Sequence, residues 1–223
     1  KPFDFEVVKH RIGNFINLYK SSNSLNDLIS DQARDLKDLI NPFVESYRYD
    51  YSENIVALKK YMKVLSRQVK EDYPEFGLDD EMTDKMSDAI EYYDIGFYSV
   101  PRSILTKKEG FTKDELDKIK SYPLFGTKML DYVLSLKSDA LYKKYASNIT
   151  RYYHENYNGT GYPEKLDGNK IPVEARIASV CINYHNLKKK YGNQAKDVIE
   201  SKSGTFFDPK IVDSMIKVID KLD

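Results

Sequence analysis

The stretch HENYNGTGYPEKLDGNKIPVEARI, residues 154–177, decides how the fold of this chain is interpreted. It follows a helical pattern and opens with His154 and Glu155, after which glycine and proline recur as far as Pro172. Glycine lets a backbone approach a ligand closely, and functional side chains concentrate on loops of this kind. The same composition is also typical of a surface turn after an ordinary helix. Taken alone, the loop leaves both interpretations open.

Helical periodicity dominates the chain on both sides of this loop, and no stretch alternates as a strand does. Apolar stripes predict amphipathic helices over residues 8–19, 25–40 and 55–69, the second kinked or ended by Pro42. The Thr112–Glu115 capping box opens a short helix that Pro123 ends or restarts. Further helices are predicted over residues 80–95, 140–153, 172–187, 193–202 and 208–222, the last with Asp208 as its N-cap and Pro209 at its first helical position. The predicted fold class is all-α, a helical bundle preceded by a long helical stalk.

The composition indicates which classes of partner and which cellular compartment are favoured. Lys plus Arg and Asp plus Glu both number 35, so no net charge attracts nucleic acid or an anionic membrane. Short apolar segments broken by charges predict neither a membrane span nor a signal peptide. A single cysteine, Cys181, rules out an internal disulfide framework, and we expect a cytoplasmic protein. Because the chain begins Lys1-Pro2 without a methionine, we expect it to be part of something longer.

Ordered motifs along the chain resemble the HD-GYP domains, a bacterial branch of the HD metal-dependent phosphohydrolases. The stretch YYDIGFYSVPRSILTKKEGFTKDELDKIKSYPLFGTKML, residues 92–130, is similar to the helix that carries the family's His-Asp pair and to the helix after it. Downstream, Phe207-Asp208-Pro209 resembles the start of the family's closing helix. In the opening stretch the matching motifs are Gly159-Thr160-Gly161-Tyr162-Pro163, Leu166-Asp167-Gly168, Ile171-Pro172 and Ala175-Arg176-Ile177. The resemblance implies an HD-domain-like bundle over residues 35–223.

Residues 1–20, KPFDFEVVKHRIGNFINLYK, resemble the end of a response-regulator receiver domain. On this resemblance Lys1 is the switch lysine of the receiver, and residues 1–34 are the end of the receiver and a helical linker. A generic amphipathic helix is the alternative for so short a motif. The implied protein is a two-component response regulator with an HD-GYP output domain, which forms a homodimer through its N-terminal helices.

The resemblance also implies a site of two or three metal ions that hydrolyses cyclic di-GMP. Imidazole and carboxylate groups bind divalent iron or manganese, which lowers the pKa of bound water. At the matching positions the chain retains Asp94 and His154, with Glu45 as a candidate third ligand. Phe97 stands near the family's lysine, and Asn158 stands where the loop has an aspartate. The remaining ligand positions hold Asn54, Tyr93, Tyr122, Tyr153 and Ile182.

These replacements favour a site without a metal. A tyrosine hydroxyl, with a pKa near 10, must ionise before it binds a metal well, and Ile182 has no ligand atom. We therefore expect no cofactor, and iron or manganese only if the chain is an enzyme. The rings of Tyr93, Tyr122 and Tyr153 are expected to fill the site, with hydroxyls that bond to Asp94, to His154 or to each other.

Three functions remain open. The first is an inactive output domain that acts by protein binding, with Gly161-Tyr162-Pro163 contacting a partner that the resemblance suggests is a diguanylate cyclase. The second is a cyclic di-GMP phosphodiesterase with a reduced metal site at Asp94 and His154. The third is a cyclic di-GMP receptor without turnover, which is less favoured because no strong basic cluster adjoins the loop to receive phosphates.

Overall fold

The computed structural model describes residues 51–107, 109–134 and 139–222. Several predictions from the sequence fall outside these residues. They are the helices over residues 8–19 and 25–40, the receiver end with Lys1, the kink at Pro42 and the candidate ligand Glu45.

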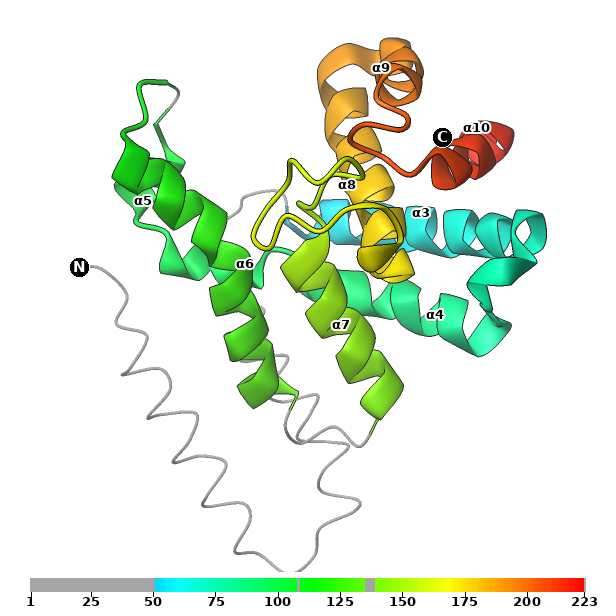
Figure 1. Ribbon diagram of the computed structural model, residues 1–223, viewed down its shortest axis with the longest axis horizontal. Coiled ribbons are helices and arrows are strands. Elements are labelled where there is room, and N and C mark those ends of the chain that lie inside the picture. Colours follow the sequence, from blue (N-terminus) through cyan, green and yellow to red (C-terminus); the bar gives the residue numbers. More distant parts are fainter. Residues whose placement is uncertain (1–50, 108, 135–138, 223) are drawn as a thin grey trace, which may run out of the picture.

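The described residues are all-α, as predicted, and contain no strand (Figure 1). The α-helices are α3 (Tyr51–Asp72), α4 (Asp80–Ala89), α5 (Arg102–Leu105), α6 (Lys113–Val133), α7 (Ala140–Tyr152), α8 (Val173–Tyr191), α9 (Ala195–Ser201) and α10 (Pro209–Leu222). Short 3₁₀ helices connect them: η1 (Pro74–Phe76), η2 (Ile90–Tyr92), η3 (Ile95–Ser99), η4 (Gly168–Lys170) and η5 (Gly192–Gln194).

The apolar stripe of α3 lies at the centre of the core. Leu58, Met62, Leu65 and Val69 are each at most 1% exposed, and α3 packs against α4, α8 and α10. Full burial of one such side chain stabilises the fold by about 1.5–3 kcal/mol relative to its exposure. The stripe predicted from the sequence is therefore confirmed as the face on which the bundle is assembled.

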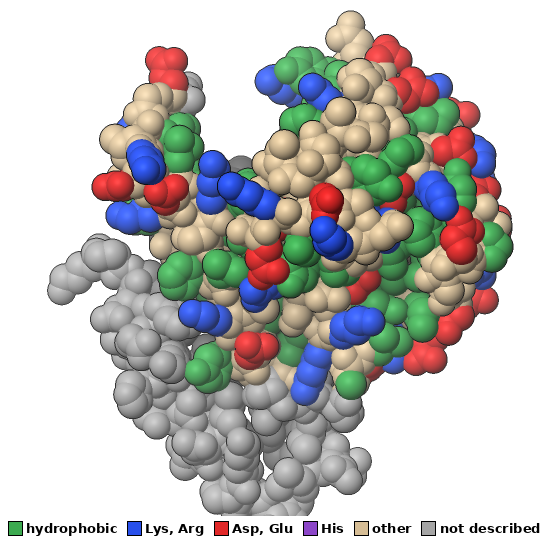
Figure 2. Space-filling model, in the orientation of Figure 1, with side chains coloured by type: hydrophobic (Ala, Val, Ile, Leu, Met, Phe, Trp, Pro, Cys, Tyr) green, Lys and Arg blue, Asp and Glu red, His purple; other side chains and the backbone are tan. Residues whose placement is uncertain are grey.

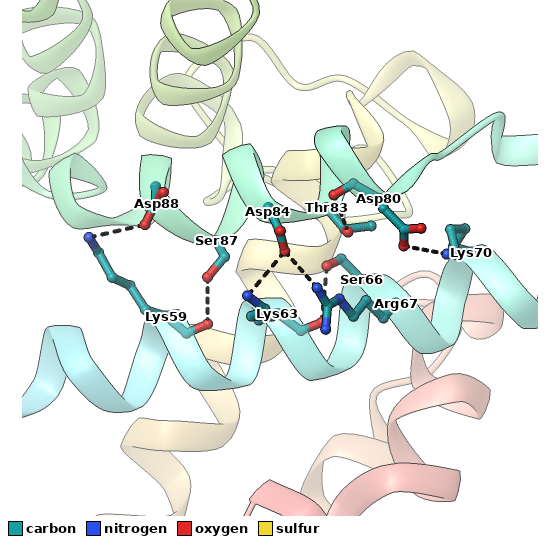
Figure 3. A network of polar contacts seen from close by, with 10 residues as sticks. All are labelled: Lys59, Lys63, Ser66, Arg67, Lys70, Asp80, Thr83, Asp84, Ser87 and Asp88. Atoms are coloured by element: carbon teal, nitrogen blue, oxygen red, sulfur yellow. Dashed lines mark hydrogen bonds and ion pairs between the residues drawn. The ribbon is translucent and has the colours of Figure 1, made fainter.

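A ladder of charge pairs joins α3 to α4 along one side of that core (Figure 3). The pairs are Lys59–Asp88 (3.5 Å), Lys63–Asp84 (3.2 Å), Arg67–Asp84 (2.9 Å) and Lys70–Asp80 (2.6 Å). Their order shows that the two helices run antiparallel. Because most of these side chains are well exposed, each pair adds little to stability. The ladder mainly favours one register of α4 on α3.

Helix α6 begins at the predicted capping box but does not end where the sequence predicted. The Thr112 side chain accepts a hydrogen bond from the Glu115 N–H at 3.3 Å, and the Glu115 carboxylate accepts one from the Thr112 N–H at 2.8 Å. The helix then continues through Pro123 to Val133, so the prediction of a break at this proline was wrong. Helix α6 packs against η3 and α7, and these contacts offset the backbone hydrogen bond that proline cannot make.

Two glycines set the close crossing of η3 and α6. A Cβ atom on Gly96 would lie 2.0 Å from the Tyr122 carbonyl oxygen, and one on Gly126 would lie 2.9 Å from the Gly96 nitrogen. Side chains do not tolerate such distances, so only glycine allows the backbones to meet there. The crossing brings the segment after Asp94 directly against the middle of α6.

Helix α8 is held to the start of α10 by a buried ion pair. The Arg176 Nη1 atom donates to Asp208 at 2.5 Å and to the Asn169 side chain at 3.1 Å. Asp208 also caps α10 by accepting from the Lys210 N–H at 2.9 Å, which confirms the predicted N-cap. This arrangement joins the end of the 154–172 loop to the closing helix. No helix in the described ranges combines the length and the apolar character that crossing a membrane requires.

Candidate functional site

Three side chains meet where α6 passes the end of α7. The Tyr122 hydroxyl, from the middle of α6, is hydrogen-bonded to the Tyr153 hydroxyl and to Nε2 of His154. Tyr122 is 1% exposed and Tyr153 is 4% exposed. The sequence therefore places a polar group in the core whose members satisfy one another, as buried polar groups must.

Aromatic rings surround this group. Phe97 stacks on Tyr122 with 4.1 Å between ring centroids, and Tyr93 meets Tyr153 edge-on at 5.4 Å. We call Tyr93, Phe97, Tyr122, Tyr153 and His154 the aromatic cluster. Ring pairs in these geometries add about 0.5–1.5 kcal/mol each beyond the area that they bury. The three tyrosines lie together, in the arrangement expected from the sequence.

Burial keeps the side chains of Tyr122, Tyr153 and His154 neutral. It raises the pKa of the Tyr122 and Tyr153 hydroxyls well above the usual value, and the nearby carboxylate of Asp94 raises both further. Burial lowers the pKa of His154 to about 3. At neutral pH the Tyr122 and Tyr153 side chains are therefore neutral phenols, and the His154 side chain is a neutral imidazole.

The 154–172 loop rests directly on this cluster. The Tyr162 ring stacks on His154 with 4.5 Å between centroids and 20° between planes. The Tyr162 N–H donates to the His154 carbonyl oxygen at 3.2 Å. A Cβ atom on Gly161 would lie 2.3 Å from the Asn156 nitrogen, so the loop closes only with glycine at this position.

A buried carboxylate holds the far half of the loop. Glu155 is 2% exposed and accepts from the N–H groups of Glu164, at 2.7 Å, and Leu166, at 3.1 Å. Burial raises the pKa of Glu155, although both hydrogen bonds oppose that shift. Sequence reasoning named Glu155 only as part of the loop's start and gave it no role. The available signal was a carboxylate directly before a glycine-rich loop, whose backbone N–H groups need acceptors.

Asn54 and Ile182 lie along α3 and α8. The Asn54 Oδ1 atom accepts from His185 Nε2 at 2.9 Å and from Lys189 Nζ at 2.5 Å. Ile182 is 4% exposed and belongs to the apolar core. His185 received no role from the sequence. The hydrogen bonds described for Asn54 are thus to α8, whereas Tyr93, Tyr122, Tyr153 and His154 contact one another.

The donor set does not fit the iron or manganese site that the sequence resemblance implies. Among the described residues, no three His, Cys, Asp or Glu side chains lie close enough together to hold a metal ion. Asp94 is 5% exposed beside the cluster, but the positions around it offer phenols whose pKa is raised rather than lowered. The Nε2 atom of His154 is already engaged by Tyr122. These residues suit mutual hydrogen bonding better than metal coordination.

The 154–172 loop lies at the surface in Figure 1, beside a notch between two parts of the bundle. Figure 2 shows this notch between the lobe of α5 and the start of α6 and the body that carries α8 and α9, with Lys and Arg side chains at its floor. On the loop, Asn158, Thr160 and Lys165 are exposed. The outer side of the loop is therefore available for contact, while its inner side is fixed by His154 and Glu155.

Comparison with known proteins places most of the chain in one family. Residues 50–211 match the family described as HD domain. A cyclic di-GMP phosphodiesterase of Vibrio cholerae serotype O1 is 25% identical over 191 residues, covering 82% of this chain and 39% of that protein. The cyclic di-GMP phosphodiesterase response regulator RpfG of Xanthomonas campestris pv. campestris is 26% identical over 231 residues, covering 97% of this chain and 60% of that protein. The chain thus spans less than two thirds of these relatives.

A solved structure supports the same fold. It is described as a crystal structure of cyclic GMP-AMP-specific phosphodiesterases of V. cholerae (V-cGAP3) and matches with a TM-score of 0.58. The match has 19% sequence identity and covers 75% of this chain and 44% of that one. At this identity the likeness shows the fold alone.

Proposed function

This chain belongs to the HD domain family, and on that premise we propose that it is a signalling domain of the cyclic di-GMP system that no longer hydrolyses the nucleotide and acts by binding another protein. Its relatives named as cyclic di-GMP phosphodiesterases support the signalling system. The match to RpfG over 97% of the chain supports a place in a two-component response regulator.

One observation carries the proposal of lost catalysis. The Tyr122 hydroxyl takes up the Nε2 atom of His154 and the Tyr153 hydroxyl, so that groups at ligand positions bond to one another. A metal would have to displace these hydrogen bonds and then find ligands among phenols that burial keeps protonated. Hydrolysis needs a hydroxide, which forms when a bound metal lowers the pKa of water. Without a bound metal, the site has no means of forming this hydroxide.

The loop supports binding as the remaining activity. Gly161 is held by close backbone contacts and Glu155 by two backbone hydrogen bonds, neither of which depends on a metal. A fixed loop with an accessible outer side suits recognition of a protein. We propose a diguanylate cyclase as the partner, bound by the outer side of the loop whose shape the Gly161-Tyr162-Pro163 motif sets, and a homodimer formed through the N-terminal helices.

Hydrolysis and nucleotide binding are tested together. Cyclic di-GMP is titrated into the purified chain by calorimetry with and without Mn²⁺, and the products are followed by chromatography. We expect neither heat nor hydrolysis. Hydrolysis with Mn²⁺ that Asp94→Ala abolishes would establish the phosphodiesterase with a reduced site, whereas heat without hydrolysis would establish a nucleotide receptor.

Partner binding is tested with the diguanylate cyclases of the source bacterium, purified one at a time. The chain is compared with a variant in which Gly161, Tyr162 and Pro163 are all replaced by alanine. Glu200→Ala, at an exposed position of α9, is the control. We expect one cyclase to bind the chain and the control but not the loop variant. Equal binding by all three proteins would remove the loop from the interface.

A further inference from the structure

The His154 ring connects the core to the loop. On one side its Nε2 atom bonds to the hydroxyl of Tyr122, which is itself 1% exposed and stacked on Phe97. On another side the ring stacks on Tyr162, whose N–H also donates to the His154 carbonyl oxygen. A continuous set of contacts therefore runs from the middle of α6, through one imidazole, to the centre of the Gly161-Tyr162-Pro163 motif.

We propose that His154 is kept as a positioning residue that holds Tyr162 in place, and that the Tyr122 hydroxyl sets the orientation of the His154 ring. The inference rests on the proposed function only in taking this loop as the surface that a partner recognises. It gives His154 a role that needs no metal.

Two anchors divide the loop between them. Glu155 holds the segment at Glu164 and Leu166 through backbone hydrogen bonds. Tyr162 lies outside that segment and contacts His154 both by ring stacking and through a backbone hydrogen bond. A flat ring provides the stacking face, and a hydrogen bond at Nε2 fixes the angle of that face. Both properties belong to histidine, and phenylalanine supplies only the first.

The physical reason for coupling is the rigidity of the inner end. Tyr122 is buried, stacks on Phe97 and is hydrogen-bonded to Tyr153. Its helix meets η3 at the Gly96 crossing, where a Cβ atom would lie 2.0 Å from the Tyr122 carbonyl oxygen. A ring bonded to such a group has little freedom to turn. Because Tyr162 stacks on this restrained ring, its side chain is also restrained before a partner binds. Less conformational entropy of the loop is then lost on binding.

Amide hydrogen exchange of the whole chain tests the inference without any partner. The readout is the protection of the Tyr162 N–H, with the amides of α10 as an internal reference for global stability. We expect His154→Ala to lower the loop protection about tenfold, because stacking and the Nε2 hydrogen bond are both lost. His154→Phe keeps the stacking face, so the protection of the Tyr162 N–H should fall only about threefold. Tyr122→Phe removes one hydroxyl from the core, and the protection of the Tyr162 N–H should fall about fivefold.

Tyr142→Phe is the matched control. It also removes a buried tyrosine hydroxyl, one that donates to Glu91 of η2 at 2.9 Å from the first turn of α7. It should leave the loop protection unchanged relative to α10. The inference is overturned if His154→Phe loosens the loop as much as His154→Ala, or if Tyr142→Phe loosens it as much as Tyr122→Phe.

Partner binding separates this inference from the proposed function. A loop that loosens in Tyr122→Phe without any change in cyclase affinity would keep the positioning role and remove the loop from recognition. A loop that stays protected in Tyr122→Phe, while the triple loop variant loses its partner, would keep the proposed function and remove the positioning role. Loosening accompanied by weaker binding is the result we expect.

Discussion

The loop and the aromatic cluster are neighbours that keep their shape by different means. The loop is shaped by its own backbone, through the close approach at Gly161 and the hydrogen bonds to Glu155. The cluster is shaped by side chains, since Tyr122, Tyr153 and His154 bond to one another. The backbone contacts at Gly161 and Glu155 do not depend on which atoms occupy the adjoining site, whereas Tyr162 also rests on the His154 ring of the cluster. On the proposed function, this difference is how the loop keeps its shape beside a site that binds no metal.

The largest expected effects come from the two glycines that fix these regions. Gly96→Ala places a Cβ atom 2.0 Å from the Tyr122 carbonyl oxygen, inside the core crossing, and Gly161→Ala places one 2.3 Å from the Asn156 nitrogen, inside the loop. We expect each to cost about 2–3 kcal/mol, because overpacked backbone must shift. Gly96→Ala should lower the midpoint of global unfolding, whereas Gly161→Ala should act mainly on loop exchange.

Gly110→Ala serves as the control for both substitutions. A Cβ atom there meets nothing within 4 Å, so only the strain of a positive φ of 70° remains. Denaturant unfolding followed by far-ultraviolet circular dichroism, together with amide exchange, compares the three variants. An equal fall in unfolding midpoint for Gly161→Ala and Gly96→Ala would contradict the separation of loop from core.

Glu155→Gln isolates the carboxylate of the loop. The amide side chain keeps one acceptor oxygen but turns an N–H group toward a backbone N–H, so one of the two hydrogen bonds is lost. We expect a cost of about 1–3 kcal/mol, which is typical for hydrogen bonds to a charged group. Exchange at Glu164 and Leu166 should accelerate while the aromatic cluster, monitored by tyrosine hydroxyl signals in NMR spectra, stays unchanged. Disturbed cluster signals would show that Glu155 supports the cluster as well as the Glu164–Leu166 segment.

The acid sensitivity of the fold reports on His154. Burial lowers its pKa to about 3 in the folded chain, while the unfolded chain keeps the ordinary value of 6.5. Between these values the unfolded state binds more protons, so stability rises with pH and falls as the solution is acidified below 6.5. From pH 6.5 to pH 5 the loss from this group is about 2 kcal/mol at most.

Unfolding measured at several pH values in the native chain and in His154→Phe checks this prediction. The free energy of unfolding should change less steeply with pH between pH 5 and 6.5 in the variant, because phenylalanine takes up no proton. Equal slopes in the two proteins would mean that His154 is not kept neutral by burial, and that its ring is more open than its contacts indicate.

The smallest effects are expected within the hydroxyl network. Tyr122→Phe and Tyr153→Phe should each cost about 1 kcal/mol, the usual net value of one hydrogen bond. Because the two hydroxyls bond to each other, the double variant should cost less than the sum of the single ones. A double-mutant cycle by denaturant unfolding measures this difference. Costs that are strictly additive would contradict the hydrogen bond between the two hydroxyls.

Several parts of the fold followed from the sequence because they depend on local physics. The stripe of α3, the capping box at Thr112 and the N-cap at Asp208 each rest on spacing or on residues three apart or fewer. Pro123 could not be placed in this way. Its local penalty predicts a break, but packing of α6 against η3 and α7 keeps the helix continuous, and those contacts come from distant residues.

The site was foreseen only as far as residue types allow. The family resemblance grouped Tyr93, Tyr122, Tyr153 and His154, and the structure brings these residues together. The same reasoning set Asn54 with them, whereas its described hydrogen bonds are to His185 and Lys189. The role of Glu155 depends on where the loop's backbone N–H groups point, which no single-residue pattern encodes.

Metal binding by the intact chain tests the central claim most directly. Mn²⁺ and Fe²⁺ are titrated anaerobically into protein purified without chelators, and bound metal is also measured by elemental analysis. A cluster whose hydroxyls and imidazole bond to one another should give less than a tenth of an equivalent of either metal, roughly the level of adventitious binding. One or two equivalents per chain that disappear in Asp94→Ala and His154→Ala would contradict the account.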